Sequence, residues 1–208
     1  MKQQLQDLNL FAKENNWRLF MTRKADPAFR GFQQKIFQRD HYTCQFCGFQ
    51  SQYFLDVVNL DYNFLNNRKR NLSTACPFCT QCFFLEIVGK SDFGGGNLIY
   101  LPEMPQNALN ALCHILFAKI VNGSGTFEKT ARNIYRSLKL RTQQVEKVFG
   151  EGLSNPSFCG QLLIETNIEN KKKFLATFNT KVRLLPDMSR FSEQIDTWMQ
   201  AGLQSLMY

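Results

Sequence analysis

Residues 44–82 read CQFCGFQSQYFLDVVNLDYNFLNNRKRNLSTACPFCTQC and contain five of the seven cysteines of the chain. A Cys-x-x-Cys turn presents two thiolates on one tight loop, and two such turns complete the tetrahedral sulfur shell that zinc prefers. Cys44 and Cys47 form the first pair. The second pair is ambiguous, because Cys76-x-x-Cys79 and Cys79-x-x-Cys82 have the same spacing. We favour Cys76 and Cys79, with Cys82 left over.

This pattern predicts a structural Zn²⁺ site that organises the central third of the chain. Iron is an alternative metal, because the run Cys76, Cys79, Cys82 is similar to part of a ferredoxin pattern, although the trailing Cys-Pro is missing. Five unligated buried thiols are the other alternative. Cys113 and Cys159 stand in apolar helical contexts, which are typical of ordinary buried thiols.

The composition is that of a globular protein. With 208 residues, of which 44% are hydrophobic, the chain can bury the core of one or two domains. No apolar stretch approaches the roughly 18 residues of a membrane span, so we expect a soluble protein that is not exported. Seven cysteines without a secretion signal indicate a reducing cytosol. The net charge of +8 favours a polyanionic or acidic partner, although a zinc site with four thiolates would itself carry about −2.

Apolar residues recur at helical spacing on both sides of the cysteines. The expected helices cover residues 1–15, the segment after Asp26-Pro27, 106–121, 128–149, the segment after Ser154-Asn155-Pro156, and a last helix from Pro186-Asp187 through Trp198 and Leu206. Residues 53–60 are expected to form a hairpin and residues 97–101 a strand. The run Gly94-Gly95-Gly96 lacks the Lys-Ser/Thr of a phosphate-binding loop and is expected to be a flexible turn.

Two segments of the central region resemble the zinc-bearing HNH endonuclease family: IFQRDHYTCQFCG at 36–48 and NLSTACPFC at 71–79. In that family two thiolate pairs hold a ββα hairpin, and a histidine on one strand activates water. The resemblance aligns Leu55–Leu60 with that strand, which places Val58 at the aspartate position, Asn59 at the catalytic histidine position and Thr80 at the usual Asn or His after the second pair.

These replacements remove the catalyst that the resemblance would otherwise imply. Asparagine cannot take a proton as an imidazole does, and Val58 cannot ligate a cation. We therefore expect no catalytic residue and no enzymatic activity. The chain has two histidines, His41 beside the first cysteine pair and His114 in an apolar helix, and we expect a structural role for each.

Over most of its length, including LPEMPQNALN at 101–110, the chain resembles subunits of the Dot/Icm type IVB secretion apparatus. The resemblance implies a non-catalytic cytosolic adaptor, docked on the C-terminal extension of the membrane-bound coupling ATPase (DotL) with associated secretion adaptors. It would support the recruitment of effector proteins at the cytoplasmic face of the bacterial inner membrane.

The alternative is a nucleic-acid-binding protein or a degenerate HNH nuclease. Its basis is the two basic runs Arg68-Lys69-Arg70 and Lys171-Lys172-Lys173, although short basic runs are usually solvated faces. Steep salt dependence of duplex binding would favour this alternative, and saturable binding to an acidic peptide would favour the adaptor. A redox protein is disfavoured, because no βαβ pattern surrounds either Cys-x-x-Cys.

Together these features predict an α+β fold, in which an HNH-like ββα zinc core is embedded in a mainly α-helical body. The expected division is into N-terminal helices (1–40), a zinc-binding core (41–92) and a mainly helical C-terminal part (93–208) that packs with the core as one unit.

Overall fold

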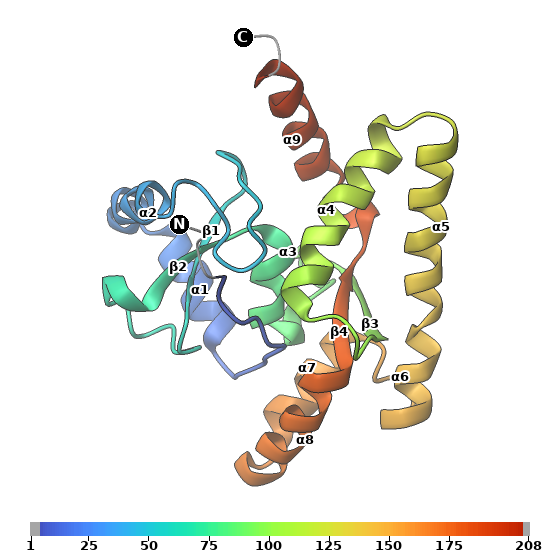
Figure 1. Cartoon of the computed structure of the whole chain (residues 1–208). Coiled ribbons are helices and arrows are strands. Elements are labelled where there is room, and N and C mark those ends of the chain that lie inside the picture. Colours follow the sequence, from blue (N-terminus) through green and yellow to red (C-terminus); the bar gives the residue numbers. More distant parts are fainter. Residues whose placement is uncertain (1–4, 206–208) are drawn as a thin grey trace.

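The computed structural model describes residues 5–205 and combines helices with two small antiparallel sheets, which confirms the α+β class (Figure 1). The helices are α1 (Asn16–Ala25), α2 (Pro27–Arg39), α3 (Pro77–Thr80), α4 (Gln106–Asn122), α5 (Thr126–Leu140), α6 (Thr142–Phe149), α7 (Pro156–Glu165), α8 (Ile168–Lys181) and α9 (Ser192–Ser205). The strands are β1 (Asp56–Asn59), β2 (Leu72–Ala75), β3 (Gly96–Tyr100) and β4 (Val182–Pro186). Short 3-10 turns are η1 (Lys69–Asn71), η2 (Gln81–Phe83), η3 (Leu85–Ile87) and η4 (Met188–Phe191).

Two of the expected helix starts are confirmed at atomic level. The Asp26 carboxylate accepts a hydrogen bond from the Ala28 amide, and Pro27 occupies the first turn of α2, where its missing N–H costs nothing. Asn155 caps α7 in the same way by accepting from the Phe158 amide, with Pro156 in the first turn. These starts were predictable because a cap depends on neighbours in the sequence.

The N-terminal segment differs from the expected helix. Its first four residues lie outside the described part of the chain, and residues 5–13 form no helix. The buried side chains are Leu8, Leu10 and Ala12, a period of two that suits an extended segment. The backbone of Phe11 bonds the Cys82 carbonyl (2.9 Å) and the Leu85 amide (3.0 Å). The helix was therefore the wrong prediction, because these distant backbone groups bond the segment in its extended form.

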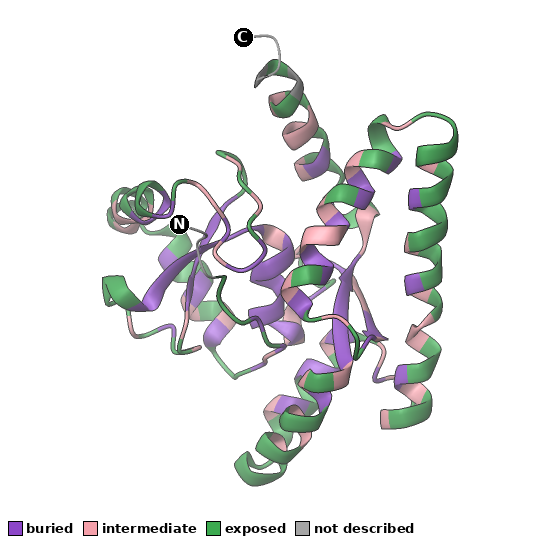
Figure 2. Ribbon diagram, in the orientation of Figure 1, coloured by how far each residue is buried: buried purple, intermediate pink, exposed green. Residues whose placement is uncertain are grey.

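The central region has the order strand, strand, helix. β1 pairs antiparallel with β2, with Asp56 opposite Ala75, and α3 follows β2 after one residue. Residues 53–60 thus supply one strand of the hairpin and not both, since its second strand lies beyond a long loop. All residues of β1 and β2 are buried, which Figure 2 shows as purple ribbon.

The C-terminal half is built on the second sheet, in which β3 pairs antiparallel with β4. The strand expected at 97–101 and the helix expected at 106–121 are confirmed as β3 and α4. The single helix expected at 128–149 is two helices, α5 and α6, because the Arg141 carbonyl accepts a hydrogen bond from the Tyr100 amide on β3 (3.2 Å). Neither α8 nor β4 was expected.

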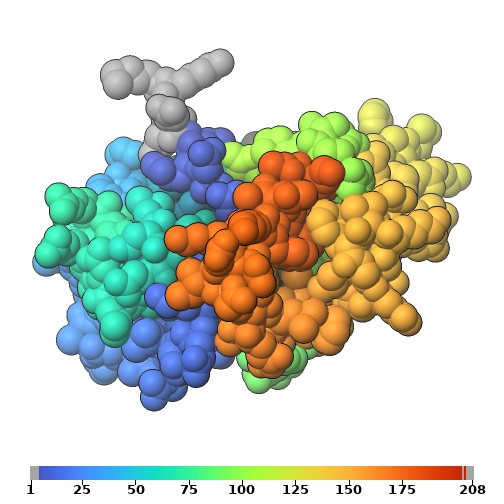
Figure 3. All heavy atoms as spheres, turned by 90° about the horizontal axis from the view of Figure 1, so that it is seen from below, coloured from blue at the N-terminus to red at the C-terminus, as the bar shows by residue number. Residues whose placement is uncertain are grey.

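One continuous cluster of buried side chains extends from Leu8 to Ile195 and includes all three of the expected segments. The N-terminal segment lies against the C-terminal half, since the Leu10 amide donates to Oδ1 of Asn179 (2.9 Å) and Lys171 Nζ to the Ala12 carbonyl (2.6 Å). Figure 3 shows this side, with α8 in orange against the blue N-terminal residues. Across residues 5–205, no helix has the length and apolar character needed to cross a bilayer.

Glycines mark two close backbone approaches. Gly96 has φ +156°, and a Cβ there would lie 2.1 Å from the Leu185 carbonyl oxygen. The Gly94–Gly96 run is thus a packed turn at the edge of the second sheet, contrary to the flexible turn expected. Gly160 lets α7 lie directly on η3, since a Cβ there would lie 2.2 Å from the Glu86 amide nitrogen.

Glu86, on η3, gives a prediction about pH. Burial raises the pKa of its carboxyl to about 7, although Lys171 and Lys90 pull the other way. The unfolded chain ionises near pH 4.5, so the folded state holds the proton over a wider range, and stability falls as pH rises from about 4.5 to about 7. Glutamine does not titrate, so we expect Glu86→Gln to abolish this decrease in the free energy of unfolding, which is on the order of 2 kcal/mol.

Urea denaturation of wild type and variant between pH 5 and 8 measures this effect as a difference, in which other titrating groups cancel. The free energy of unfolding of the variant should increase relative to that of wild type as pH rises, and the difference should stay constant above about pH 7. The exposed Glu151 provides the matched control, Glu151→Gln. A constant difference across this range would show that Glu86 does not titrate there.

Candidate metal centre

The first cysteine pair lies on a tight turn just before β1. The Cys44 amide donates to the Phe49 carbonyl (2.8 Å), and the Gly48 amide donates to the Cys44 carbonyl (2.9 Å). Gly48, the residue after the pair, has φ +77°, a left-handed conformation that glycine adopts readily. This closed turn directs both thiols to the same side.

The second pair opens α3. The Cys79 and Thr80 amides both donate to the Cys76 carbonyl, at 2.9 and 2.8 Å, and Pro77 fills the first helical position. β2 leads directly into this turn and is held by Asp40, whose Oδ2 accepts from the Thr74 amide (2.9 Å). The hairpin therefore delivers Cys76 and Cys79 to the turn that carries the first pair.

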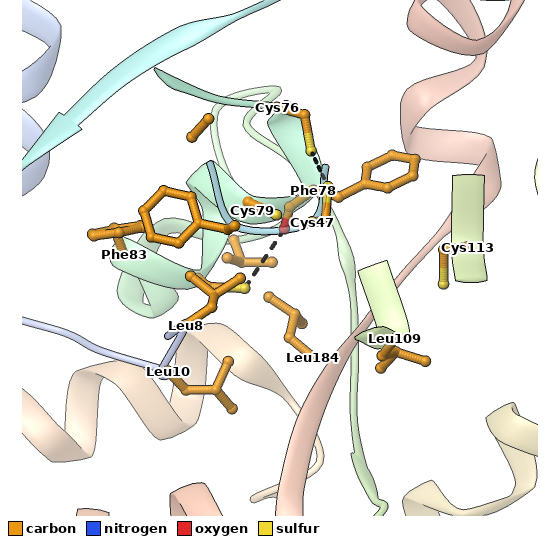
Figure 4. Close-up of a cluster of buried hydrophobic side chains, with 14 of the residues drawn as sticks. Leu8, Leu10, Cys47, Cys76, Phe78, Cys79, Phe83, Leu109, Cys113 and Leu184 are labelled. Atoms are coloured by element: carbon orange, nitrogen blue, oxygen red, sulfur yellow. Dashed lines mark hydrogen bonds between the residues drawn. The ribbon is translucent and has the colours of Figure 1, made fainter. Parts of the chain in front are cut away.

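The structure brings together the four cysteines expected as ligands. The Sγ atoms of Cys44, Cys47, Cys76 and Cys79 lie within 4.8 Å of one another, and all four residues are buried. The distance from Cys47 Sγ to Cys76 Sγ is 3.6 Å. Tetrahedral zinc with Zn–S bonds of about 2.3 Å requires S–S separations of about 3.8 Å. The cluster therefore fits a tetrahedral metal ion, and Figure 4 shows three of these cysteines within the buried core.

Within this cluster the thiols have unequal affinities for protons. Burial would raise the pKa of the Cys44 thiol, but hydrogen bonds from Cys47, Cys76 and Cys79 lower it well below its usual range. Burial raises the pKa of Cys76 and Cys79, and the neighbouring Cys44 and Cys47 raise it further. Four thiolates this close require a cation, because adjacent buried negative charges repel one another.

The remaining cysteines lie outside the cluster. The Cys82 thiol instead donates to the Phe78 carbonyl (3.5 Å), and burial raises its pKa. Burial also raises the pKa of Cys113, and that of Cys159 to about 12. All three are buried and protonated at neutral pH, as expected of core thiols.

The strand aligned with the HNH catalytic strand presents no reactive group to solvent. Val58, Asn59 and Thr80 are each fully buried. The Asn59 amide nitrogen donates to the carbonyls of Asn63 (3.0 Å) and Asn66 (2.8 Å). Its hydrogen-bonding capacity is thus used inside the protein, and Asn59 stabilises the loop between β1 and β2.

A buried arginine completes this network. Arg23 of α1 donates from Nη1 to Oδ1 of Asn59 (2.6 Å) and of Asn67 (2.8 Å), and from Nη2 to the Val57 carbonyl (2.6 Å). Burial lowers the pKa of Arg23 to about 10, partly opposed by Asp56, so the guanidinium is charged at neutral pH. It bonds the side chain of Asn59, the residue that the HNH resemblance aligns with the catalytic histidine.

The two histidines have different surroundings. His41 is exposed, and its carbonyl accepts from the Thr43 hydroxyl and from Gln50. His114 Nε2 lies 3.4 Å from Cys76 Sγ, and one turn earlier on α4 Asn110 Nδ2 lies 3.2 Å from Cys79 Sγ. Sequence reasoning missed both contacts. The available signal was a polar pair four residues apart on the apolar face of a helix.

The fold and the site define an α+β protein with a buried cluster of four cysteines. No family model matches the chain. It is 50% identical, over 204 residues covering 98% of its length and 94% of the relative, to the type 4 apparatus protein DotN of Legionella pneumophila. The chain therefore belongs to the DotN (IcmJ) family.

Proposed function

We propose that this protein is a non-catalytic adaptor subunit of a type IVB secretion coupling complex. It binds the C-terminal extension of the coupling ATPase DotL and supports effector recruitment together with other secretion adaptors. The observation that carries the proposal is the 50% identity to a type 4 apparatus protein along nearly the whole of both chains. Since no helix of residues 5–205 could span a membrane, the protein would reach the cytoplasmic face of the inner membrane through this partner.

Zinc is the metal we propose for the centre, with Cys44, Cys47, Cys76 and Cys79 as ligands. Soft thiolates in a tetrahedral set suit zinc, although they also suit iron. A bound zinc ion would supply structural stabilisation by holding the first turn against α3. All four sulfurs belong to residues that are at most 7% exposed, which leaves no open ligand position for a substrate.

The absence of catalysis is part of the same proposal. A general base must reach a proton on substrate or water, and the strand position that would carry it holds the fully buried Asn59. Its neighbour Val58 offers no ligand atom, and Arg23 fills the space beside the strand. These residues support a scaffold that retains the HNH-like order of elements without its chemistry.

One basic run that supports the nucleic-acid alternative, Arg68-Lys69-Arg70, is exposed to solvent. The other run is partly engaged within the protein. Lys171 donates to the Ala12 carbonyl (2.6 Å), whereas Lys172 and Lys173 are exposed, and Lys173 forms a surface ion pair with Glu169 (2.7 Å). The basic surface available to a phosphate backbone is thus smaller than the two runs suggest.

A direct binding measurement tests the proposal. The zinc-loaded protein is titrated with the purified C-terminal extension of DotL at 0.05, 0.15 and 0.3 M salt, and heat is recorded by calorimetry. We expect saturable binding that persists at the highest salt concentration, because a specific protein interface buries apolar area as well as charge. Duplex DNA in the same salt series should bind weakly.

The matched control carries Arg68→Ser, Lys69→Ser and Arg70→Ser together, which removes the exposed basic run and leaves the cysteine cluster intact. Wild-type affinity of this variant for the extension supports the adaptor. Failure of the wild type to bind the extension, with duplex binding that weakens steeply with salt and is lost in the triple variant, would establish the nucleic-acid alternative.

A further inference from the structure

Helix α4 reaches the cysteine cluster with two side chains. Asn110 Nδ2 lies 3.2 Å from Cys79 Sγ, and His114 Nε2 lies 3.4 Å from Cys76 Sγ. The two residues are one turn apart, so they face the same side of α4. α4 belongs to the C-terminal half, whereas the four cysteines belong to the central region. Both contacts are therefore made between segments that are distant in the sequence.

The charge of a loaded centre gives these contacts their importance. Four thiolates and one divalent ion carry a net charge of about −2. The four residues are at most 7% exposed, so water can solvate little of that charge. Hydrogen-bond donors within the protein must then supply the stabilisation, since an unpaired buried charge is costly. A thiolate accepts only, which requires the tautomer of His114 with hydrogen on Nε2.

Aromatic packing keeps the imidazole in the position that this bond requires. Its ring stacks on Phe49 with centroids 3.7 Å apart and on Phe78 with centroids 4.2 Å apart. Trp198 of α9 approaches the same ring, at 5.1 Å. Phe49 follows the first cysteine pair and Phe78 lies inside the second, so both turns of the metal centre contribute to the stack.

The same ring forms part of a groove on the surface. This groove has a volume of about 510 Å³, and His114 lines it together with residues of the first turn and of α9, Trp198 among them. The Nε2 edge of the imidazole thus meets the buried sulfur, while Phe49 and Phe78, which stack on the ring, also line the groove.

We propose that Asn110 and His114 are positioning residues of the metal centre, and that they donate hydrogen bonds to the thiolates of Cys79 and Cys76. Donation to a metal thiolate withdraws charge from the sulfur and holds it in orientation, and loss of such an outer partner typically weakens metal binding about 10- to 100-fold. The inference rests on the proposed loading of the four cysteines and requires no particular protein partner.

His114 is the better residue to test, because Asn110 also donates to the Phe78 carbonyl and its removal would disturb the backbone. His114→Phe keeps the aromatic stack and removes the donor. His114→Gln places an amide N–H near the position of Nε2 and gives up the stack. The exposed His41 provides the control His41→Asn, because asparagine tolerates the backbone φ of +52° there.

The measurements are made on the full-length holo protein. Zinc release to excess chelator should be about 10-fold faster or more in His114→Phe than in wild type. The thiolate-to-metal charge-transfer band of the cobalt-substituted variant should move to lower energy, because the sulfur has lost a donor. His114→Gln should restore the band toward its wild-type position, and His41→Asn should match wild type in both measurements.

Three results would overturn the inference. Wild-type release and spectrum in His114→Phe would show that no hydrogen bond matters at Cys76. If the cobalt charge-transfer band of His114→Gln were shifted from its wild-type position as far as that of His114→Phe, the role of His114 would be packing alone. A wild-type protein that binds neither zinc nor cobalt would refute the proposed metal centre and this inference with it, while leaving the binding of DotL to be judged by its own titration.

Discussion

Cys47→Ser is expected to unfold the central region of this protein. The variant removes one of four sulfurs that lie within 4.8 Å of one another in the core, and serine is a poor zinc ligand. Structural zinc contributes on the order of 10 kcal/mol in small zinc domains, which is comparable with the whole free energy of unfolding of a typical protein. Elemental analysis measures the loss of metal, and limited proteolysis of the full chain shows whether cleavage sites within residues 41–92 become accessible.

Cys159→Ser is the control for this prediction. Cys159 is buried on α7, outside the cluster, so its replacement should cost about 1 kcal/mol and leave the metal content unchanged. Treatment of wild type with a strong chelator should reproduce the behaviour of Cys47→Ser. Unchanged melting and full protease resistance in Cys47→Ser would mean that the cluster contributes nothing through a metal.

Arg23→Leu is expected to lower the free energy of unfolding by about 3–5 kcal/mol. Arg23 is 8% exposed, and its guanidinium bonds Asn59, Asn67 and the Val57 carbonyl. Leucine would leave the two buried acceptors, Asn59 Oδ1 and the Val57 carbonyl, without this donor, and each buried unpaired polar group costs about 1–3 kcal/mol. Urea denaturation at pH 7 with saturating zinc measures the change.

The exposed Arg18 on the same helix is the matched control. Arg18→Leu removes the same charge from α1 but breaks none of the three bonds, so its effect should stay within about 0.5 kcal/mol. Equal small effects of the two substitutions would show that the Arg23 network is replaced by water or by rearrangement of the loop between β1 and β2.

The parts of this protein that sequence reasoning predicted correctly are those with local causes. Two Cys-x-x-Cys turns bring their sulfurs together within each turn by spacing alone. Asp26-Pro27 and Asn155-Pro156 start helices because each cap bonds an amide two or three residues ahead.

The errors arose where distant groups took part. Residues 5–13 have apolar side chains at helical spacing, yet their backbone bonds Gln45, Cys82 and Leu85 in an extended form. β4 has only five residues, Val-Arg-Leu-Leu-Pro, and is too short for periodicity to distinguish it from a buried helix; it became a strand because β3 was available as its partner. The break between α5 and α6 likewise follows from a bond to Tyr100.

The sequence by itself thus determined which cysteines could share a metal and where two of the helices begin. Only the tertiary structure decided that Cys82 lies outside the cluster, that Arg23 and Asn59 bond each other, and that Asn110 and His114 of α4 contact the sulfurs. The physical reason is range: caps and turns depend on neighbours in the chain, whereas buried polar groups must find partners wherever folding brings them.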